Sequence, residues 1–289
     1  MLITNYIQEK KALIDQRIKE LVKEDQNDLL KAASYSLFPG GKRLRPILTL
    51  ATVDTFNLDS IIALDVACSL EFIHTYSLIH DDLPSMDNDD LRRNKPTLHK
   101  AYPEWLAILT GDFLLTYAFE VITSSTLSDA KKAKITSVLA KRAGANGMLM
   151  GQVIDLSSIG KTIDQDTLEK MHYHKTACII MAALEIGGII GNANAKELEG
   201  LKNFGKYLGI AYQIQDDILD VEAKEEDLGK PVLSDKEKNK PTAVTVYGLK
   251  DAKKMVKEFY EKALLYLSAL SFPPKLLKDL AFVLLQRYK

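Results

Sequence analysis

The chain has 289 residues, 46% of them hydrophobic and 27% charged, which is enough to bury one large core or two modest ones. Its formal net charge of -1 argues against a general polyanion-binding surface and so against a nucleic-acid-binding protein, although local basic pockets are compatible with it. Cys68 and Cys178 lie in apolar surroundings without metal-ligand spacing, which predicts buried free thiols in a reducing compartment.

The N-terminal twenty residues carry a charge every few positions, which is not the pattern of a secretory signal peptide. No uninterrupted apolar run reaches the roughly 18 to 20 residues that a membrane span needs. Residues 177–190 come closest, but this stretch is short and contains Glu185. We therefore expect a cytoplasmic protein without a membrane span.

Helical periodicity dominates the sequence. Within residues 61–80, apolar side chains recur at spacings of three, four and seven, at Ile62, Val66, Ile73, Tyr76 and Ile79. No proline falls between Pro103 and Pro231, which leaves room for several long helices, and strand signals are scarce. We expect an all-α fold of about ten helices in a single domain spanning residues 1–289.

Basic residues cluster in three short segments. The segment PGGKRLRP (residues 39–46) offers Lys42, Arg43 and Arg45, LRRNKPTLHK adds Arg92 and Arg93, and HYHKTA adds Lys175 with Thr176. The planar fork of arginine suits bidentate phosphate contacts, whereas lysine acts as a compact point charge. These segments are therefore candidates for phosphate binding, although surface pairs of lysine and arginine are common.

Carboxylates form two clusters, each joined to an apolar helical segment. The first contains Asp81, Asp82 and Asp87, and the second, QIQDDILD, contains Asp216, Asp217 and Asp220. Spacing of four residues puts Asp216 and Asp220 on the same side of a helix. Either Asp-Asp pair alone could be a solvated helix end. Two such clusters together favour a divalent cation, because like charges on an apolar face are costly to bury alone.

An all-oxygen ligand set suits Mg²⁺ or Ca²⁺ rather than zinc. Residues 87–98 do not match an EF-hand calcium loop, because Arg92 stands where the sixth residue must be glycine. Mg²⁺ commonly binds through a few carboxylates together with substrate phosphates. The two clusters could thus hold one diphosphate through shared Mg²⁺ ions.

Residues 222–241 are dense in both charges and are interrupted by Gly229 and Pro231, which predicts a solvated loop. Five motifs occur in order along the chain: GGKRLRP, LIHDDLPSMDNDDLRRNKPTLH, GDFLL, HKTA and YQIQDDILD…LGK…NKPT. In this order they resemble the motifs of the trans-isoprenyl diphosphate synthases, also called polyprenyl synthetases, and most closely those of the short-chain bacterial type. The resemblance covers about residues 40–242.

The resemblance implies an isoprenoid synthase fold around a deep central cavity, a homodimer, and three Mg²⁺ ions bound with the allylic diphosphate. It assigns the metal ligands to both acidic clusters. Contacts to the allylic diphosphate fall to Arg92, Lys175 and Lys230, and contacts to isopentenyl diphosphate fall to Lys42, Arg45, His74 and Arg93. Thr176 and Gln213 would face the developing carbocation, and Lys240 would lie on a loop that closes over the site, so residues 222–241 gain a second interpretation as a lid.

The implied activity is the condensation of isopentenyl diphosphate with dimethylallyl and then geranyl diphosphate. In the family, the residues four and five positions before the first aspartate form the floor that stops the growing chain; here they are Ser77 and Tyr76. An aromatic ring at the fifth position favours farnesyl diphosphate, and a geranylgeranyl product is the alternative. The competing interpretation is that Tyr76 only packs in the hydrophobic core and has no effect on product length.

Two departures from the family pattern leave the charged contacts intact. Asn94 replaces a glycine after the arginine pair, where asparagine tolerates left-handed backbone angles, and Ala177 replaces a glycine after Lys-Thr. His80 is expected to be a hydrogen-bond partner rather than a metal ligand, because Mg²⁺ prefers oxygen. A class I terpene cyclase would lack the GGKRLRP and DDILD motifs. A catalytically silent regulatory subunit, the remaining alternative, would tend to lose one acidic motif.

Overall fold

The computed structural model describes residues 2–24, 26–38, 40–222 and 239–286, in two compact units. The first unit comprises Met1–Leu50 and Asp59–Thr136, and the second comprises Ala51–Leu58 and Ser137–Lys289. The prediction of an all-α fold is confirmed: the described residues are 76% helical and contain a single two-stranded ribbon. Both cysteines are free and buried, as expected.

The first unit is built from helices and one short β-ribbon. Its elements are α1 (Ile3–Leu21), α2 (Asp28–Leu37), the first part of α3 (Leu44–Thr55), the 3-10 turn η1 (Ser60–Ala63), α4 (Leu64–Asp81), β1 (Leu91–Arg92), β2 (Lys95–Pro96), α5 (Leu98–Ala101), α6 (Glu104–Ser124) and the start of α7 (Asp129–Ala143). The side chain of Asn27 caps α2 by accepting the backbone N–H of Leu30 at 2.9 Å.

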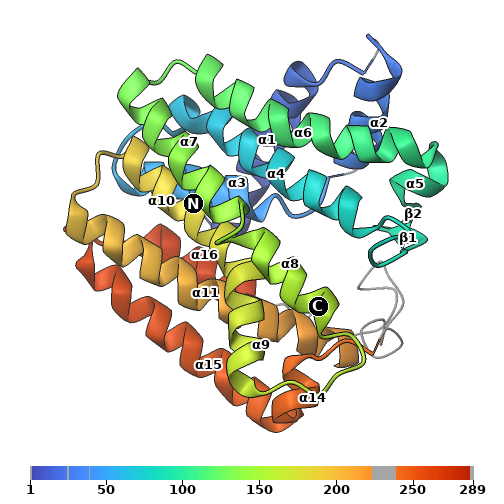
Figure 1. The fold of residues 1–289 in the computed structure, drawn as a ribbon. Coiled ribbons are helices and arrows are strands. Elements are labelled where there is room, and N and C mark those ends of the chain that lie inside the picture. The colour runs from blue at the N-terminus through green and yellow to red at the C-terminus, as the bar shows by residue number, and fades with distance from the viewer. Residues whose placement is uncertain (1, 25, 39, 223–238, 287–289) are drawn as a thin grey trace. The chain divides into compact units, whose positions relative to one another are not determined.

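Helix α4 delivers the first acidic cluster. All of its residues 66–73 are buried, so it has no polar face, as expected for a helix in the interior of a unit. It runs alongside α6 (Figure 1). The helix ends at Asp81 because Leu83 precedes Pro84, and a residue before proline is driven out of the helical region. The chain therefore leaves the interior at the aspartates.

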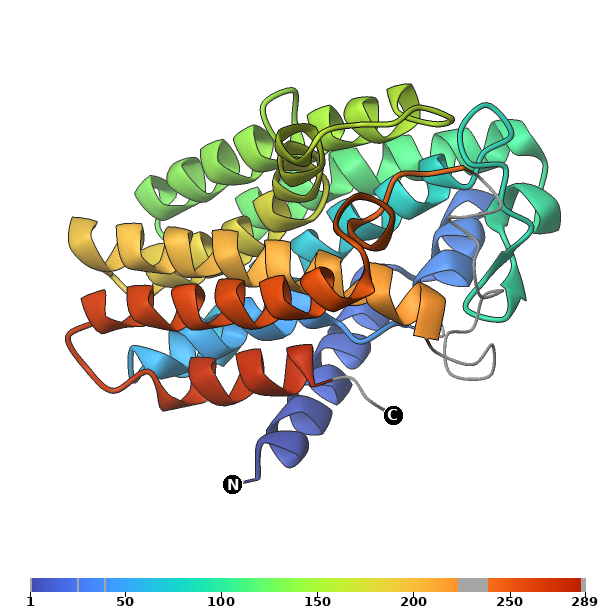
Figure 2. The ribbon, with the colours of Figure 1, turned by 90° about the horizontal axis from the view of Figure 1, so that it is seen from below.

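The second unit contains the longest helix of the described chain. Its elements are the rest of α3 and α7, α8 (Met148–Ser157), α9 (Gln165–His172), the π turn η2 (Tyr173–Ala177), α10 (Cys178–Ile190), α11 (Ala195–Glu222), α14 (Ala243–Tyr247), α15 (Leu249–Tyr266), the 3-10 turn η3 (Leu267–Ala269) and α16 (Lys275–Leu285). Helices α11 and α15 lie side by side (Figure 2). Gly205 allows α11 to approach α10, because a Cβ there would lie 3.0 Å from the Cα of Met181.

Three helical stretches differ from the expectation that no segment is apolar enough to cross a membrane. By length and composition alone, residues 60–81, 104–124 and 165–190 are long and apolar enough, although charged residues interrupt each of them. In the first and third, 67% and 72% of the apolar window is buried inside the protein, so packing accounts for their composition. In α6 only 44% is buried, which leaves apolar side chains at the surface.

Candidate active site

The ribbon after α4 turns at two residues with left-handed backbone angles. Arg92 pairs with Lys95, which leaves Arg93 (φ 53°) and Asn94 (φ 61°) as a two-residue turn. Positive φ at both central positions is the geometry of a type I′ turn, in which asparagine is well tolerated. Asn94 thus does what a glycine would do there, as the sequence analysis expected. The same geometry in Arg93 is unusual for a residue with a long side chain.

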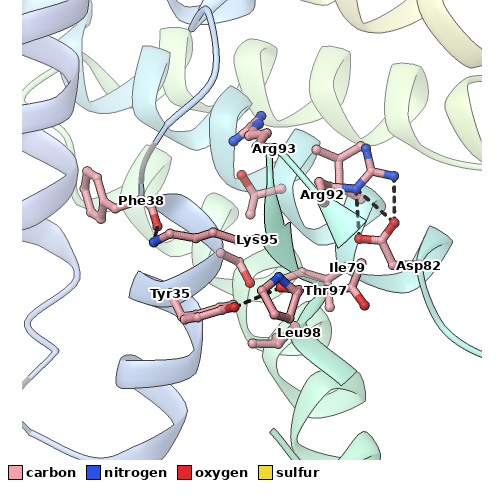
Figure 3. Close-up of a pocket in the computed structure, with 13 residues that line it drawn as sticks. Tyr35, Phe38, Ile79, Asp82, Arg92, Arg93, Lys95, Thr97 and Leu98 are labelled. Atoms are coloured by element: carbon pink, nitrogen blue, oxygen red, sulfur yellow. Dashed lines mark hydrogen bonds and ion pairs between the residues drawn. The ribbon is translucent and has the colours of Figure 1, made fainter. Parts of the chain in front are cut away.

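This turn directs Arg92 toward the first acidic cluster. Arg92 Nη2 donates to Asp82 Oδ1 at 2.6 Å, and its Nε lies 2.8 Å from Oδ2, a bidentate pair drawn in Figure 3. The side chain of Asp82 is only 4% exposed. Burial raises the pKa of Asp82 to about 6, even though the hydrogen bonds and charge of Arg92 oppose the rise. Asp82 is therefore a carboxylate that needs positive charge nearby to stay ionised.

The three aspartates of the first cluster belong to one folded turn. The backbone N–H of Asp87 donates to the carbonyl of Asp81 at 2.9 Å. This hydrogen bond brings Asp87, five residues after Asp82, back to the end of α4. Within the described ranges, no three His, Cys, Asp or Glu side chains converge into a ready-made metal site. The ligand chemistry still fits Mg²⁺, because all the donors are carboxylates and Mg²⁺ completes its shell with water and phosphate oxygens.

His74 lies on α4 two turns before Asp81 and is influenced by nearby arginines. Burial lowers the pKa of His74 well below its ordinary value, and the charges of Arg45 and Arg93 lower it further. His74 is therefore neutral at pH 7 and can offer a hydrogen bond in a strongly positive neighbourhood. Lys42, from the same basic segment as Arg45, is exposed. This group is the anion-binding candidate of the first unit.

Arg43 differs from the expectation that it contributes to phosphate binding. It is buried, and it donates to Asp15 at 2.8 Å, to Glu71 at 2.7 Å and to the carbonyl of Leu37 at 2.7 Å. All three groups of the guanidinium are thereby engaged within the protein. Its φ of 50° places the backbone in the left-handed region. Arg43 is a structural residue that ties the GGKRLRP segment to α1, α2 and α4.

His80 connects α4 to α6, next to the first aspartate. Its Nε2 lies 3.0 Å from the carbonyl oxygen of Ile108, and its ring lies against Gly111, where a Cβ would collide with it. The glycine of the GDFLL motif thus makes room for the histidine, and the hydrogen-bonding role expected of His80 is consistent with this contact. One turn before it, Tyr76 is buried and meets the His80 ring edge-on, with centroids 5.9 Å apart. Ser77 donates to the carbonyl of His74 at 2.8 Å.

A pocket in the first unit opens beside the end of α4 and the β-ribbon (Figure 3). It is lined by α2, α4 and the ribbon, and its wall includes Tyr35, Thr75, Ile79, Arg93 and Thr97. Asp82 and Arg92 stand on one side of it, and Arg93 lies apart from that pair. The wall combines apolar surface with two arginines, which suits a ligand that carries both a hydrocarbon part and negative charge.

In the second unit, Lys175 and Thr176 lie in the π turn between α9 and α10. A π turn inserts an extra residue into a helix and is often found at functional sites. Two glycines accommodate it: a Cβ on Gly151 would collide with the backbone of Lys175, and one on Gly209 with the backbone of Ala177. The backbone of α8 and that of α11 therefore press directly against the turn.

The second acidic cluster lies on α11, and Asp217 is the hub of its contacts. Asp217 Oδ2 accepts the backbone N–H of Ala243 at 2.7 Å, and Oδ1 accepts the amide of Gln213 at 2.9 Å. Gln213 in turn accepts the hydroxyl of Thr176 at 2.6 Å. His172 Nε2 lies 3.3 Å from Asp217 Oδ2. The expected pair Thr176 and Gln213 is thus joined to the aspartate by a continuous chain of hydrogen bonds.

Asp155 is a site residue that sequence reasoning missed. Its Oδ2 accepts Lys175 Nζ at 2.6 Å and Lys240 Nζ at 3.0 Å. It lies on α8 on the same side as the buried Met148 and Gly151, at spacings of three and four. A carboxylate on the buried face of an apolar helix is the signal that could have found it, because such a group needs a partner.

The remaining predicted residues are accounted for as follows. Asp216 is half-buried and Asp220 is buried, both on α11, which confirms that they share a helix. Lys230 and most of the predicted lid segment lie outside the described residues. Lys240, at the far end of that segment, is buried against Asp155.

Comparisons with known proteins agree with these motifs. A family model described as Polyprenyl synthetase matches residues 26–265. A farnesyl diphosphate synthase of Geobacillus stearothermophilus is 44% identical over 266 residues, 90% of each chain. A solved geranylgeranyl pyrophosphate synthetase from Pyrococcus horikoshii is 33% identical, with a TM-score of 0.91 over 99% of this chain and 98% of that one. A geranyltransferase from Helicobacter pylori, solved with magnesium and isoprenyl diphosphate, is 32% identical, with a TM-score of 0.86 over 99% and 97%.

Proposed function

The chain belongs to the polyprenyl synthetase family and is a prenyltransferase, and we propose that it condenses isopentenyl diphosphate with dimethylallyl and then geranyl diphosphate to give farnesyl diphosphate. The 44% identity to a farnesyl diphosphate synthase over 90% of each chain supports a short-chain product. The whole chain would form one synthase domain. The likeness to a geranylgeranyl pyrophosphate synthetase keeps the twenty-carbon product as the second candidate.

One observation carries the proposal: a neutral, half-buried histidine lies among several arginines in the first unit. Burial lowers the pKa of His74, and the charges of Arg45 and Arg93 lower it further. Cations collected around one group produce a positive potential that attracts a polyanion. We assign the diphosphate of isopentenyl diphosphate to Lys42, Arg45, His74 and Arg93, and that of the allylic substrate to Arg92, Lys175 and Lys230.

Magnesium fits the two acidic clusters. The donors would be Asp81, Asp82, Asp87, Asp216, Asp217 and Asp220, all of them carboxylates, and three ions would bind with the allylic diphosphate. The H. pylori relative solved with magnesium supports this choice of metal. When bound, magnesium neutralises the charge that develops on the leaving diphosphate. The pKa of Asp82, raised by burial, is lowered again by any cation placed beside it.

The residues of the chain itself would bind, orient and shield the reactants. As the allylic C–O bond breaks, its electron pair leaves with the diphosphate, on which the cationic side chains act electrostatically. The hydroxyl of Thr176 and the amide oxygen of Gln213, already joined at 2.6 Å, would face the allylic cation. The double bond of isopentenyl diphosphate then attacks, and a proton is lost to the released diphosphate. Lys240 and the lid would exclude water, which would otherwise quench the cation.

Tyr76 would set the length of the product. Its ring is 4% exposed and lies on α4 five residues before Asp81, which corresponds to roughly 7.5 Å along the helix axis. A buried aromatic ring in a close-packed interior is a rigid stop for a growing hydrocarbon chain. We therefore propose Tyr76, with Ser77 beside it, as the floor at fifteen carbons.

We also propose a homodimer in the cytoplasm. Helix α6 presents Trp105, Ile108 and Leu109 to solvent, with 62%, 40% and 49% of each side chain exposed. A contiguous exposed apolar patch commonly marks an interface with another protein chain. The two buried free thiols support a reducing compartment.

The direct test is to incubate the purified protein with isopentenyl and dimethylallyl diphosphates and Mg²⁺, with and without chelator, and to size the products by chromatography. The proposal predicts a fifteen-carbon product that disappears when the metal is removed. Twenty carbons would select the second candidate. Absence of any C10 to C20 product would reject the enzyme assignment.

A further inference from the structure

Asp155 joins two cations that come from distant parts of the second unit. Its Oδ2 binds Lys175, 20 residues later, at 2.6 Å and Lys240, 85 residues later, at 3.0 Å. Lys175 lies in the π turn, and Lys240 lies just before α14. The side chains of Asp155 and Lys240 are only 6% and 8% exposed. One buried carboxylate therefore fixes the position of both ammonium groups.

The two lysines determine the ionisation of Asp155. Burial on its own would raise the pKa of Asp155, but the charges and hydrogen bonds of Lys175 and Lys240 outweigh burial and hold the pKa below its ordinary value. Two ammonium groups that bind the same carboxylate oxygen would repel each other strongly at low dielectric if that carboxylate were absent. Asp155 therefore stays ionised and lies between the two ammonium groups, which lets them be held close together.

Backbone contacts make the junction rigid. Gly151 and Asp155 are one turn apart on α8, and the backbone of Lys175 presses against Gly151, so α8 carries both the carboxylate and the surface that holds the π turn. On the other side, Asn239 accepts the backbone N–H of Gly160 at 3.0 Å, next to Lys240. Both lysines are thus anchored at the backbone as well as at the ammonium group.

We propose that Asp155 is a positioning residue for the allylic diphosphate: by binding Lys175 and Lys240 together, it holds Lys175, a contact assigned to that diphosphate, in place before the substrate arrives. The proposal rests on the proposed function, because that function supplies the diphosphate. Asp155 itself contacts no substrate. Its removal should weaken diphosphate binding at the allylic site and leave the isopentenyl site of the first unit intact.

The test compares Asp155→Asn with Glu185→Gln, a matched control that removes another partly buried carboxylate paired with an arginine, 3.1 Å from Arg142 in the same unit. For Asp155→Asn, the KM for dimethylallyl diphosphate should rise about tenfold or more, equivalent to about 1.4 kcal/mol, with the KM for isopentenyl diphosphate within about twofold. Glu185→Gln should change neither KM by more than about twofold. Equal KM values in Asp155→Asn and the wild type would overturn the proposal.

A binding measurement separates this proposal from the proposed function. Calorimetry with Mg²⁺ and inorganic pyrophosphate needs no turnover, and Asp155→Asn should bind about tenfold more weakly than the wild type. An inactive wild type would reject the synthase assignment, whereas an active wild type with unchanged pyrophosphate binding in Asp155→Asn would overturn only the role of Asp155.

A second pair of variants covers the case in which Asp155→Asn does not fold. Removing both partners of a buried ion pair costs much less than removing one, so Asp155→Asn combined with Lys240→Met should fold. Pyrophosphate should bind this double variant more weakly than Lys240→Met alone, because Lys175 has lost its anchor. Equal binding by the two would overturn the proposal.

Discussion

Replacing Tyr76 with alanine should lengthen the product from fifteen to twenty carbons. The ring is buried on α4 and meets His80 edge-on, with centroids 5.9 Å apart, one turn before the first aspartate. Burial raises the pKa of its hydroxyl to about 12, so the side chain is neutral at the pH of the assay. Removing the ring opens space along the helix axis for one more five-carbon unit.

The substitution also has a stability cost that can be worked from the burial. Replacing a buried aromatic side chain with alanine typically costs about 3–5 kcal/mol. For a protein of this size, each kcal/mol lowers Tm by about 2–4 °C, so a fall of about 10 °C is expected. The product assay must therefore be run well below the Tm of the variant, which calorimetry would determine first.

The matched control is Tyr6→Ala on α1, where a tyrosine of similar burial, 8% exposed, is removed away from the acidic clusters. It should lower Tm and leave the product at fifteen carbons. Chromatographic sizing of the products from isopentenyl and geranyl diphosphates distinguishes the two variants. A fifteen-carbon product from folded Tyr76→Ala would remove Tyr76 from the floor.

Three further predictions test the site. Gly209→Ala should cost about 1–3 kcal/mol in thermal unfolding, because its Cβ collides with the backbone of Ala177 in the π turn; an unchanged Tm would contradict that packing. Arg43→Ala should cost about 3–5 kcal/mol in urea unfolding, because Glu71 would be left buried without its partner; a cost below about 1 kcal/mol would refute the structural role. Asp155→Asn should lose stability against the wild type above about pH 4, the ordinary aspartate pKa, and the difference should vanish as pH falls through the lowered pKa of folded Asp155; a difference independent of pH would contradict the ion pair.

The helices and the acidic motifs could be predicted from the sequence because their signals are local. Apolar spacing along residues 61–80 predicted the helix that becomes α4, and the i, i+4 spacing of Asp216 and Asp220 predicted that they share a helix, α11. Asparagine at position 94 predicted a left-handed turn residue, and its φ of 61° agrees.

The features that could not be predicted depend on contacts between distant segments. The ribbon of β1 and β2 has two residues in each strand, too few for an alternating pattern. The π turn at Lys175 depends on Gly151 and Gly209, which lie in other helices. In the sequence, Arg43 cannot be told apart from the basic residues beside it. Only its contacts with Asp15, Glu71 and the carbonyl of Leu37 show that it is a structural arginine and not a substrate-binding one.

The most direct measurement is the rate of fifteen-carbon product formation by Asp82→Asn and Asp217→Asn at saturating Mg²⁺, against Asp129→Asn, an exposed aspartate on α7, as the control. If two carboxylate clusters act with the metal on the leaving diphosphate, each of the first two variants should lose about a hundredfold or more in rate, while the control keeps the wild-type rate. Wild-type rates in both Asp82→Asn and Asp217→Asn, unaffected by chelator, would contradict the account.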